Sequence, residues 1–60
     1  MFIELTTCEG LTFLLNTRCI EQVCNNGEKG CLIYIQNDEF NPYYVEEPYG
    51  YLRSVLLNKW

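Results

Sequence analysis

The hydrophobic residues of this 60-residue chain change their spacing at Glu47-Pro48. Before this point they occur mostly in short runs of strand length that are bounded by turn residues. After it they recur at helical spacing, at Tyr49, Leu52, Val55 and Leu56. Strands and helices place side chains with different periods, about 2 and about 3.6 residues. The sequence therefore predicts one small α+β domain over residues 1–60, with a small antiparallel sheet or meander closed by one C-terminal helix.

Four to five segments have the composition of strands. We expect them at about residues 2–7, 11–15, 20–24, 31–36 and 41–45. Tight turns are predicted between them at Glu9-Gly10, Asn25-Asn26-Gly27 and Asn37-Asp38, because Asn and Gly tolerate positive φ. In the second strand, Leu14 falls on the face opposite Leu15, which predicts a strand that is covered on both sides.

Two positions depart from a regular strand pattern. Ile20 and Val23 are three residues apart, so a bend, bulge or short helical turn is expected around residues 16–19. Pro42 has no N–H to donate to a ladder, so it is predicted to lie at the beginning of the last strand or on an unpaired edge.

The helix is expected at about residues 48–58. Proline suits the first turn of a helix, and Pro48 stands at that position. Glu46 and Glu47 favour the positive N-terminal end of the helix, and Lys59 lies near the negative C-terminal end.

Composition limits the classes of function. Hydrophobic residues make up 48% of the chain and aromatic residues 15%, which is too apolar for a disordered protein. A chain of this length buries only about 60% of the surface that its unfolded form exposes, so a partner subunit is the expected support for a thin core. The net charge is −4 and the four cations are scattered, at Arg18, Lys29, Arg53 and Lys59. Direct binding of nucleic acid is therefore not expected.

The N-terminal residues have neither a basic region nor a long apolar segment, and the longest apolar runs in the chain are only a few residues. These features predict no signal peptide, no membrane span and a cytoplasmic protein.

Four cysteines allow three interpretations. Cys19 and Cys24 come near the spacing of a zinc knuckle, but Cys8 and Cys31 do not complete two close pairs, and the chain has no histidine. Disulfides belong mainly to secreted proteins, and buried free thiols are the interpretation that we favour. A nucleophilic cysteine needs a base, usually histidine. We therefore expect no enzyme, no catalytic residue and no cofactor.

The order of residues resembles a known group. Phe2-Ile3-Glu4-Leu5-Thr6, Leu14-Leu15-Asn16 and Gly30-Cys31-Leu32-Ile33-Tyr34 are similar to segments of small FlbD-like proteins of flagellar and swarming motility. They also resemble short uncharacterised proteins of bacteria and phages. The resemblance covers nearly the whole chain and implies a small strand-rich domain with a C-terminal helix, which acts through protein contacts rather than catalysis.

Tyrosines gather around the expected junction between the last strand and the helix. Tyrosine is favoured in interfaces because it combines a large apolar area with a polar tip. The predicted binding residues are Tyr44, Tyr49, Tyr51, Arg53 and Arg18. They favour a homo-oligomeric, protein-binding module that modulates or inhibits a larger bacterial protein, such as a phage-encoded inhibitor of a host defence system. The alternatives are an oligomeric sponge that holds a nucleotide-like signal between subunits, and a zinc-stabilised domain.

Overall fold

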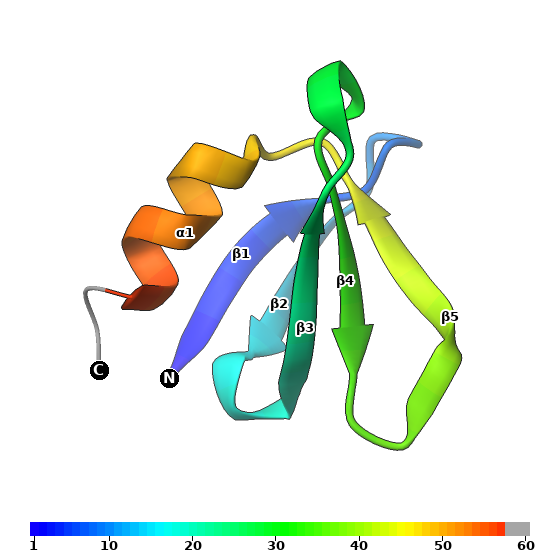
Figure 1. Cartoon of the computed structure of the whole chain (residues 1–60), viewed down its shortest axis with the longest axis vertical. Helices are drawn as coiled ribbons and strands as arrows, with labels where there is room; N and C mark the ends of the chain where they lie inside the picture. Colours follow the sequence, from blue (N-terminus) through cyan, green and yellow to red (C-terminus); the bar gives the residue numbers. More distant parts are fainter. Residues whose placement is uncertain (58–60) are drawn as a thin grey trace.

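Five antiparallel strands precede one helix, as the sequence predicted for an α+β domain (Figure 1). The computed structural model describes residues 1–57, apart from the side chain of Glu39. Its elements are β1 (Phe2–Thr6), β2 (Thr12–Asn16), the short 3₁₀ helix η1 (Thr17–Cys19), β3 (Ile20–Asn25), the 3₁₀ helix η2 (Gly27–Lys29), β4 (Cys31–Ile35), β5 (Asp38–Val45) and α1 (Tyr49–Leu57). The predicted helix end at residue 58 and Lys59 lie outside the described residues. In residues 1–57, no helix is long and apolar enough to cross a membrane.

The strands are divided between two sheets. β1 pairs with β2 in one, and β3, β4 and β5 form the other in that order. Of the bend, bulge or short helical turn predicted around residues 16–19, the structure has a short helical turn, η1, and it separates the two sheets. Its N-cap residue Asn16 accepts a hydrogen bond from the backbone N–H of Arg18 at 3.1 Å, and the buried Thr17 donates through its hydroxyl to the carbonyl of Met1 at 3.1 Å. These bonds give hydrogen-bond partners to polar groups of η1, where the chain passes from one sheet to the other.

The two sheets are joined where β1 and β5 end. Thr7 and Val45 form an isolated antiparallel bridge, and the N–H of Glu46 donates to the carbonyl of Thr6 at 2.9 Å. The N–H of Cys8 also donates to the carbonyl of Tyr44, at 3.0 Å. Figure 1 shows this corner at the top of the molecule, from which α1 runs back beside β1. The corner fixes where the helix begins.

The core lies between the two sheets and beneath the helix. Its buried side chains are Ile3, Leu5, Leu15, Cys31, Ile33, Val45 and Leu52. The helical stripe predicted from the sequence is confirmed, because Leu52 is fully buried and Tyr49, Val55 and Leu56 pack against the core. On the other side of the core, the rings of Phe13 and Tyr43 pack with their centroids 5.1 Å apart.

The structure differs from the predictions in β5 and β2. β5 begins at Asp38 rather than at residue 41, so Pro42 lies inside the strand and not at its beginning, while the predicted alternative of an edge position is confirmed. Pro42 is accommodated there because β5 is an edge strand of its sheet and its register with β4 shifts between Ile33 and Ile35. β2 is not covered on both sides by the chain itself, because Leu14 is 65% exposed.

Candidate binding site

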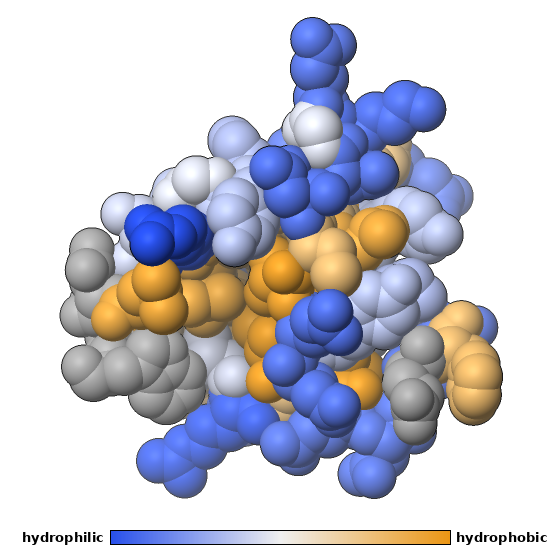
Figure 2. Space-filling model, viewed as in Figure 1, coloured by the Kyte–Doolittle hydropathy of each residue, from blue (hydrophilic) through white to orange (hydrophobic). Residues whose placement is uncertain are grey.

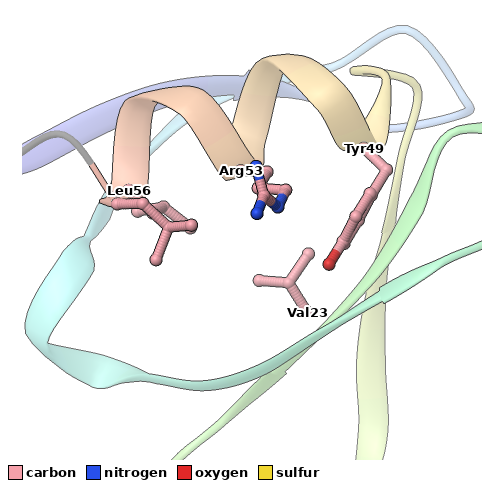
Figure 3. A pocket seen from close by; sticks show the side chains of 5 residues that line it. Val23, Tyr49, Arg53 and Leu56 are labelled. Atoms are coloured by element: carbon pink, nitrogen blue, oxygen red, sulfur yellow. The ribbon is translucent and has the colours of Figure 1, made fainter.

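A hollow lies between helix α1 and strand β3 (Figure 3). It has a volume of about 210 Å³ and is lined by Val23, Tyr49, Arg53, Leu56 and Leu57. Figure 3 shows the side chains of Tyr49, Arg53 and Leu56 directed from the helix toward Val23 on the strand. Most of its wall is apolar, and the guanidinium of Arg53 is its charged group.

Helical spacing explains why these residues meet. From Tyr49, the residues Arg53, Leu56 and Leu57 follow at i+4, i+7 and i+8, which places all of them along one side of α1. Val23 belongs to β3, where it pairs with Ile33 and is only half-buried. The hollow therefore forms where the side of α1 next to its core-facing stripe passes over β3, an edge strand of the three-stranded sheet.

The surface around the hollow is apolar with a hydrophilic rim. Figure 2 shows apolar side chains, in orange, running from the helix side of the molecule onto the three-stranded sheet. Leu57 is 58% exposed and Arg53 is also exposed, whereas Tyr49 and Leu56 are half-buried. In the described part of the chain, Arg53 is not among the side chains that form a hydrogen bond. An apolar group with an adjacent anion or acceptor would match both features of this hollow.

The structure brings together two of the five predicted binding residues, Tyr49 and Arg53. Tyr44 is 56% exposed on β5, and Arg18 is exposed on η1. Tyr51 is 49% exposed and lies about 200° around the helix from Tyr49, on a different face. These three residues line surfaces other than the hollow.

Sequence reasoning missed Val23, Leu56 and Leu57 as site residues. Leu56 belongs to the apolar stripe and was predicted only as a core residue. Arg53 and Leu57 follow Tyr49 at helical spacing, so the sequence did contain a signal that these three side chains share one side of the helix. Nothing in the sequence paired Val23 with the helix, because that contact joins segments far apart in the chain.

The cysteines are free thiols with different environments. Cys31 is buried, Cys24 is half-buried, and Cys8 and Cys19 are exposed. The prediction of buried thiols is therefore right for Cys31 and wrong for Cys8 and Cys19, which lie in or beside turns. Among the described side chains, no group of three acidic or cysteine residues is arranged to hold a metal ion.

A small polar cluster fixes the junction that leads into α1. The backbone N–H of Thr6 donates to both carboxylate oxygens of Glu47, at 3.0 and 2.9 Å. The thiol of Cys31 donates to the backbone carbonyl of Glu47 at 3.3 Å. Burial raises the pKa of the Cys31 thiol, and the negative charge of Glu47 and the nearby Cys24 raise it further. The cluster holds Glu47 two residues before Tyr49, the first residue of α1 and the first of its residues that line the hollow.

Comparisons of the chain with protein families, with curated proteins and with solved structures found no match. The resemblance to small FlbD-like proteins therefore stays a prediction.

Proposed function

We propose that this chain is a non-enzymatic protein-binding module that modulates or inhibits a larger bacterial protein. The observation that carries the proposal is the apolar hollow between α1 and β3 with the guanidinium of Arg53 at its wall. In this proposal the partner inserts an apolar side chain between Tyr49, Leu56 and Val23 and places a carboxylate beside Arg53. Anchoring aromatic and arginine residues of this kind dominate the energetics of many protein interfaces.

Size favours a protein side chain over a complete nucleotide. Sites for small molecules usually enclose about 300–1,000 Å³. The hollow has about 210 Å³, which matches one large side chain. The sponge for a nucleotide-like signal would need a second copy of the chain to enlarge this space, and Arg18 lies outside the lining.

The site suits a partner of acidic character at the point of contact, although the whole chain carries a net charge of −4. Arg53 supplies a local positive charge on this surface, and charge-assisted hydrogen bonds are about twice as strong as neutral ones. The flagellar and phage contexts implied by the sequence resemblance both fit a module that docks on a larger protein.

The test is capture of a partner from a bacterial lysate with the tagged chain and two variants of the hollow. Arg53→Ala removes the charge and Leu57→Ala removes an exposed part of the wall. We expect Arg53→Ala to weaken capture by about tenfold or more, since a hydrogen bond to a charged group contributes about 1.5–3 kcal/mol. Circular dichroism checks that each variant is folded.

The matched control is Tyr51→Ala, on the same helix but outside the hollow. Capture that is lost with Arg53→Ala and Leu57→Ala and retained with Tyr51→Ala supports the proposal. Capture that is lost only with Tyr51→Ala would contradict it and move the site to the other face of α1. A nucleotide retained by the purified wild-type chain in native mass spectrometry, and lost from Arg53→Ala, would favour the sponge instead.

A further inference from the structure

The outer edge of β2 presents backbone groups that β1 does not use. In the β1–β2 ladder, Ile3 lies opposite Leu15, and Leu5 lies opposite Phe13. The N–H of Thr7 donates to the carbonyl of Leu11, and the N–H of Thr17 donates to that of Met1. Because bonded pairs alternate along an antiparallel ladder, the odd-numbered residues of β2 face β1. The N–H and C=O groups of Thr12, Leu14 and Asn16 therefore point away from β1.

Each of the other edge strands carries at least one protective feature. Glu46 and Glu47 bind the end of the outer edge of β1, at Thr6. β3 carries Glu21 and a register shift beside it, and α1 lies against this strand. β5 contains Pro42 and a register shift. Charges, prolines and irregularities are the features by which proteins prevent an edge strand from pairing with another chain.

β2 has none of these features. Its five residues are Thr12, Phe13, Leu14, Leu15 and Asn16, without a charge or a proline, and its register with β1 is regular. Leu14 is 65% exposed on the outward face, and Phe2, which is diagonal to it on β1, is 63% exposed. A regular, uncharged edge beside exposed apolar side chains is the kind of edge that pairs with another strand.

We propose that β2 pairs antiparallel with β2 of a second copy of this chain, about a two-fold axis that passes through Leu14. In this arrangement Leu14 lies opposite its own copy, and Thr12 lies opposite Asn16 of the other copy. The free N–H and C=O groups of Thr12 and Leu14 and the N–H of Asn16 then become bonded, and the two hairpins form one four-stranded sheet. The carbonyl of Asn16, the N-cap of η1, already accepts the first bond of that helix and accepts a second bond through its other lone pair. The pairing uses no residue of the hollow between α1 and β3, so it stands independently of the proposed function.

The arrangement is compatible with the charge of the chain. The carboxylate nearest to the axis in the register is Glu4, which lies opposite Leu14 on β1. The two copies of Glu4 would be separated by three strand spacings, about 14 Å at about 4.8 Å each. This distance exceeds the screening length of about 8 Å at physiological salt, so their repulsion is weak.

Hydrogen exchange followed by NMR at increasing concentrations of the wild-type chain tests the register directly. The proposal expects the amides of Thr12, Leu14 and Asn16 to become protected as concentration rises, together with a shift from monomer to dimer in sedimentation. The amides of Phe13 and Leu15, which face β1, serve as internal references that are protected at every concentration. A chain that stays monomeric up to about 1 mM, the limit of weak affinity, would overturn the proposal. A dimer with concentration-dependent protection outside β2 would overturn it too.

A pair of variants separates edge pairing from general hydrophobic association. Leu14→Lys places two like charges directly opposite each other across the axis, which is destabilising in a sheet. Phe2→Lys makes the same change at a side chain of equal exposure on β1, away from the axis. We expect Leu14→Lys to raise the dimer dissociation constant by about tenfold or more, and Phe2→Lys by less than about threefold. Equal effects of the two substitutions would contradict the two-fold pairing.

Discussion

The two outer edges of the β1–β2 hairpin differ in whether another part of the chain binds them. The end of the β1 edge is closed by the chain itself, because the backbone and carboxylate of the Glu46-Glu47 junction bind Thr6. The β2 edge lacks such a partner within residues 1–57, and Leu14 beside it is largely exposed. The junction between β5 and α1 lies beside the end of β1, so it binds that edge of the hairpin and does not reach β2. The comparison teaches that a very small domain can bind one edge of a hairpin with its own chain while the other edge has no such contact in the described residues.

The largest effect on the closed edge is expected from a substitution at Gly30. A Cβ at this position would lie 2.0 Å from the carbonyl oxygen of Val45 and less than 3 Å from the backbone of Glu46, and φ is +89°. Gly30→Ala must therefore push β5 away from its place at the junction. We expect a loss of about 3 kcal/mol or more, a large part of the total of about 3–9 kcal/mol for a chain of this size. Urea unfolding followed by circular dichroism measures it.

Gly27→Ala is the control for the effect of positive φ alone. Gly27 has φ of +65°, but a Cβ there would meet no atom within 4 Å. Its substitution should cost only about 1–2 kcal/mol, the usual penalty for a left-handed residue. If both substitutions cost the same, the close approach at Gly30 is not what closes the edge.

Removing the carboxylate of Glu47 should weaken the contact between the junction and the β1 edge, and unlike Gly30→Ala it introduces no steric clash. Glu47→Ala leaves the N–H of Thr6 without its acceptor, in a part-buried place. We expect a loss of about 1–3 kcal/mol in the free energy of unfolding and faster hydrogen exchange at the Thr6 amide. Glu46→Ala is the matched control, because Glu46 binds Thr6 through its backbone and its side chain is exposed. A Thr6 amide that exchanges equally fast in both variants would contradict the role given to the carboxylate.

Local features of the sequence were sufficient to predict the elements. The change of period at Glu47-Pro48 predicted α1, and the spacing of Ile20 and Val23 predicted a bend, bulge or short helical turn where the structure has η1. Both signals lie within a few residues of the element that they predicted. The residues predicted as a binding group were only partly brought together, because periodicity along α1 connects Tyr49 with Arg53 but connects neither with Tyr44 or Arg18.

Contacts between distant segments could not be predicted in this way. The hydrogen bonds from Thr6 to Glu47 span 41 residues, and the hollow depends on Val23 meeting a helix that begins 26 residues later. The division of the strands into two sheets is also non-local, since it depends on where β1 and β5 meet. A single sequence shows which segments form strands and where they turn, whereas the pairing of their edges depends on the packing of the whole chain.

The smallest expected effect concerns Cys31, which lies inside the closed junction while Cys8 and Cys19 are exposed. Burial and the charge of Glu47 raise the pKa of the Cys31 thiol above its ordinary value of 9.0. The folded state therefore favours the neutral thiol, whose contribution to stability is complete below pH 9.0 and is lost as the pH rises toward the folded-state pKa. We expect the urea midpoint of the wild type to fall above pH 9.0 more steeply than that of Cys31→Ala.

Alkylation at neutral pH measures the same environment without changing the fold. Since the thiolate is the reactive form and Cys31 is both neutral and buried, iodoacetamide should modify it about tenfold or more slowly than Cys8 and Cys19. Mass spectrometry of the labelled peptides gives the three rates in one sample. Glu47→Ala should raise the rate at Cys31 because it removes a negative charge and opens the junction, and should leave the rate at Cys19 unchanged. A Cys31 that reacts as fast as Cys19 in the wild-type chain would mean that the junction does not bury this thiol, and the closure of the β1 edge by the junction would be contradicted.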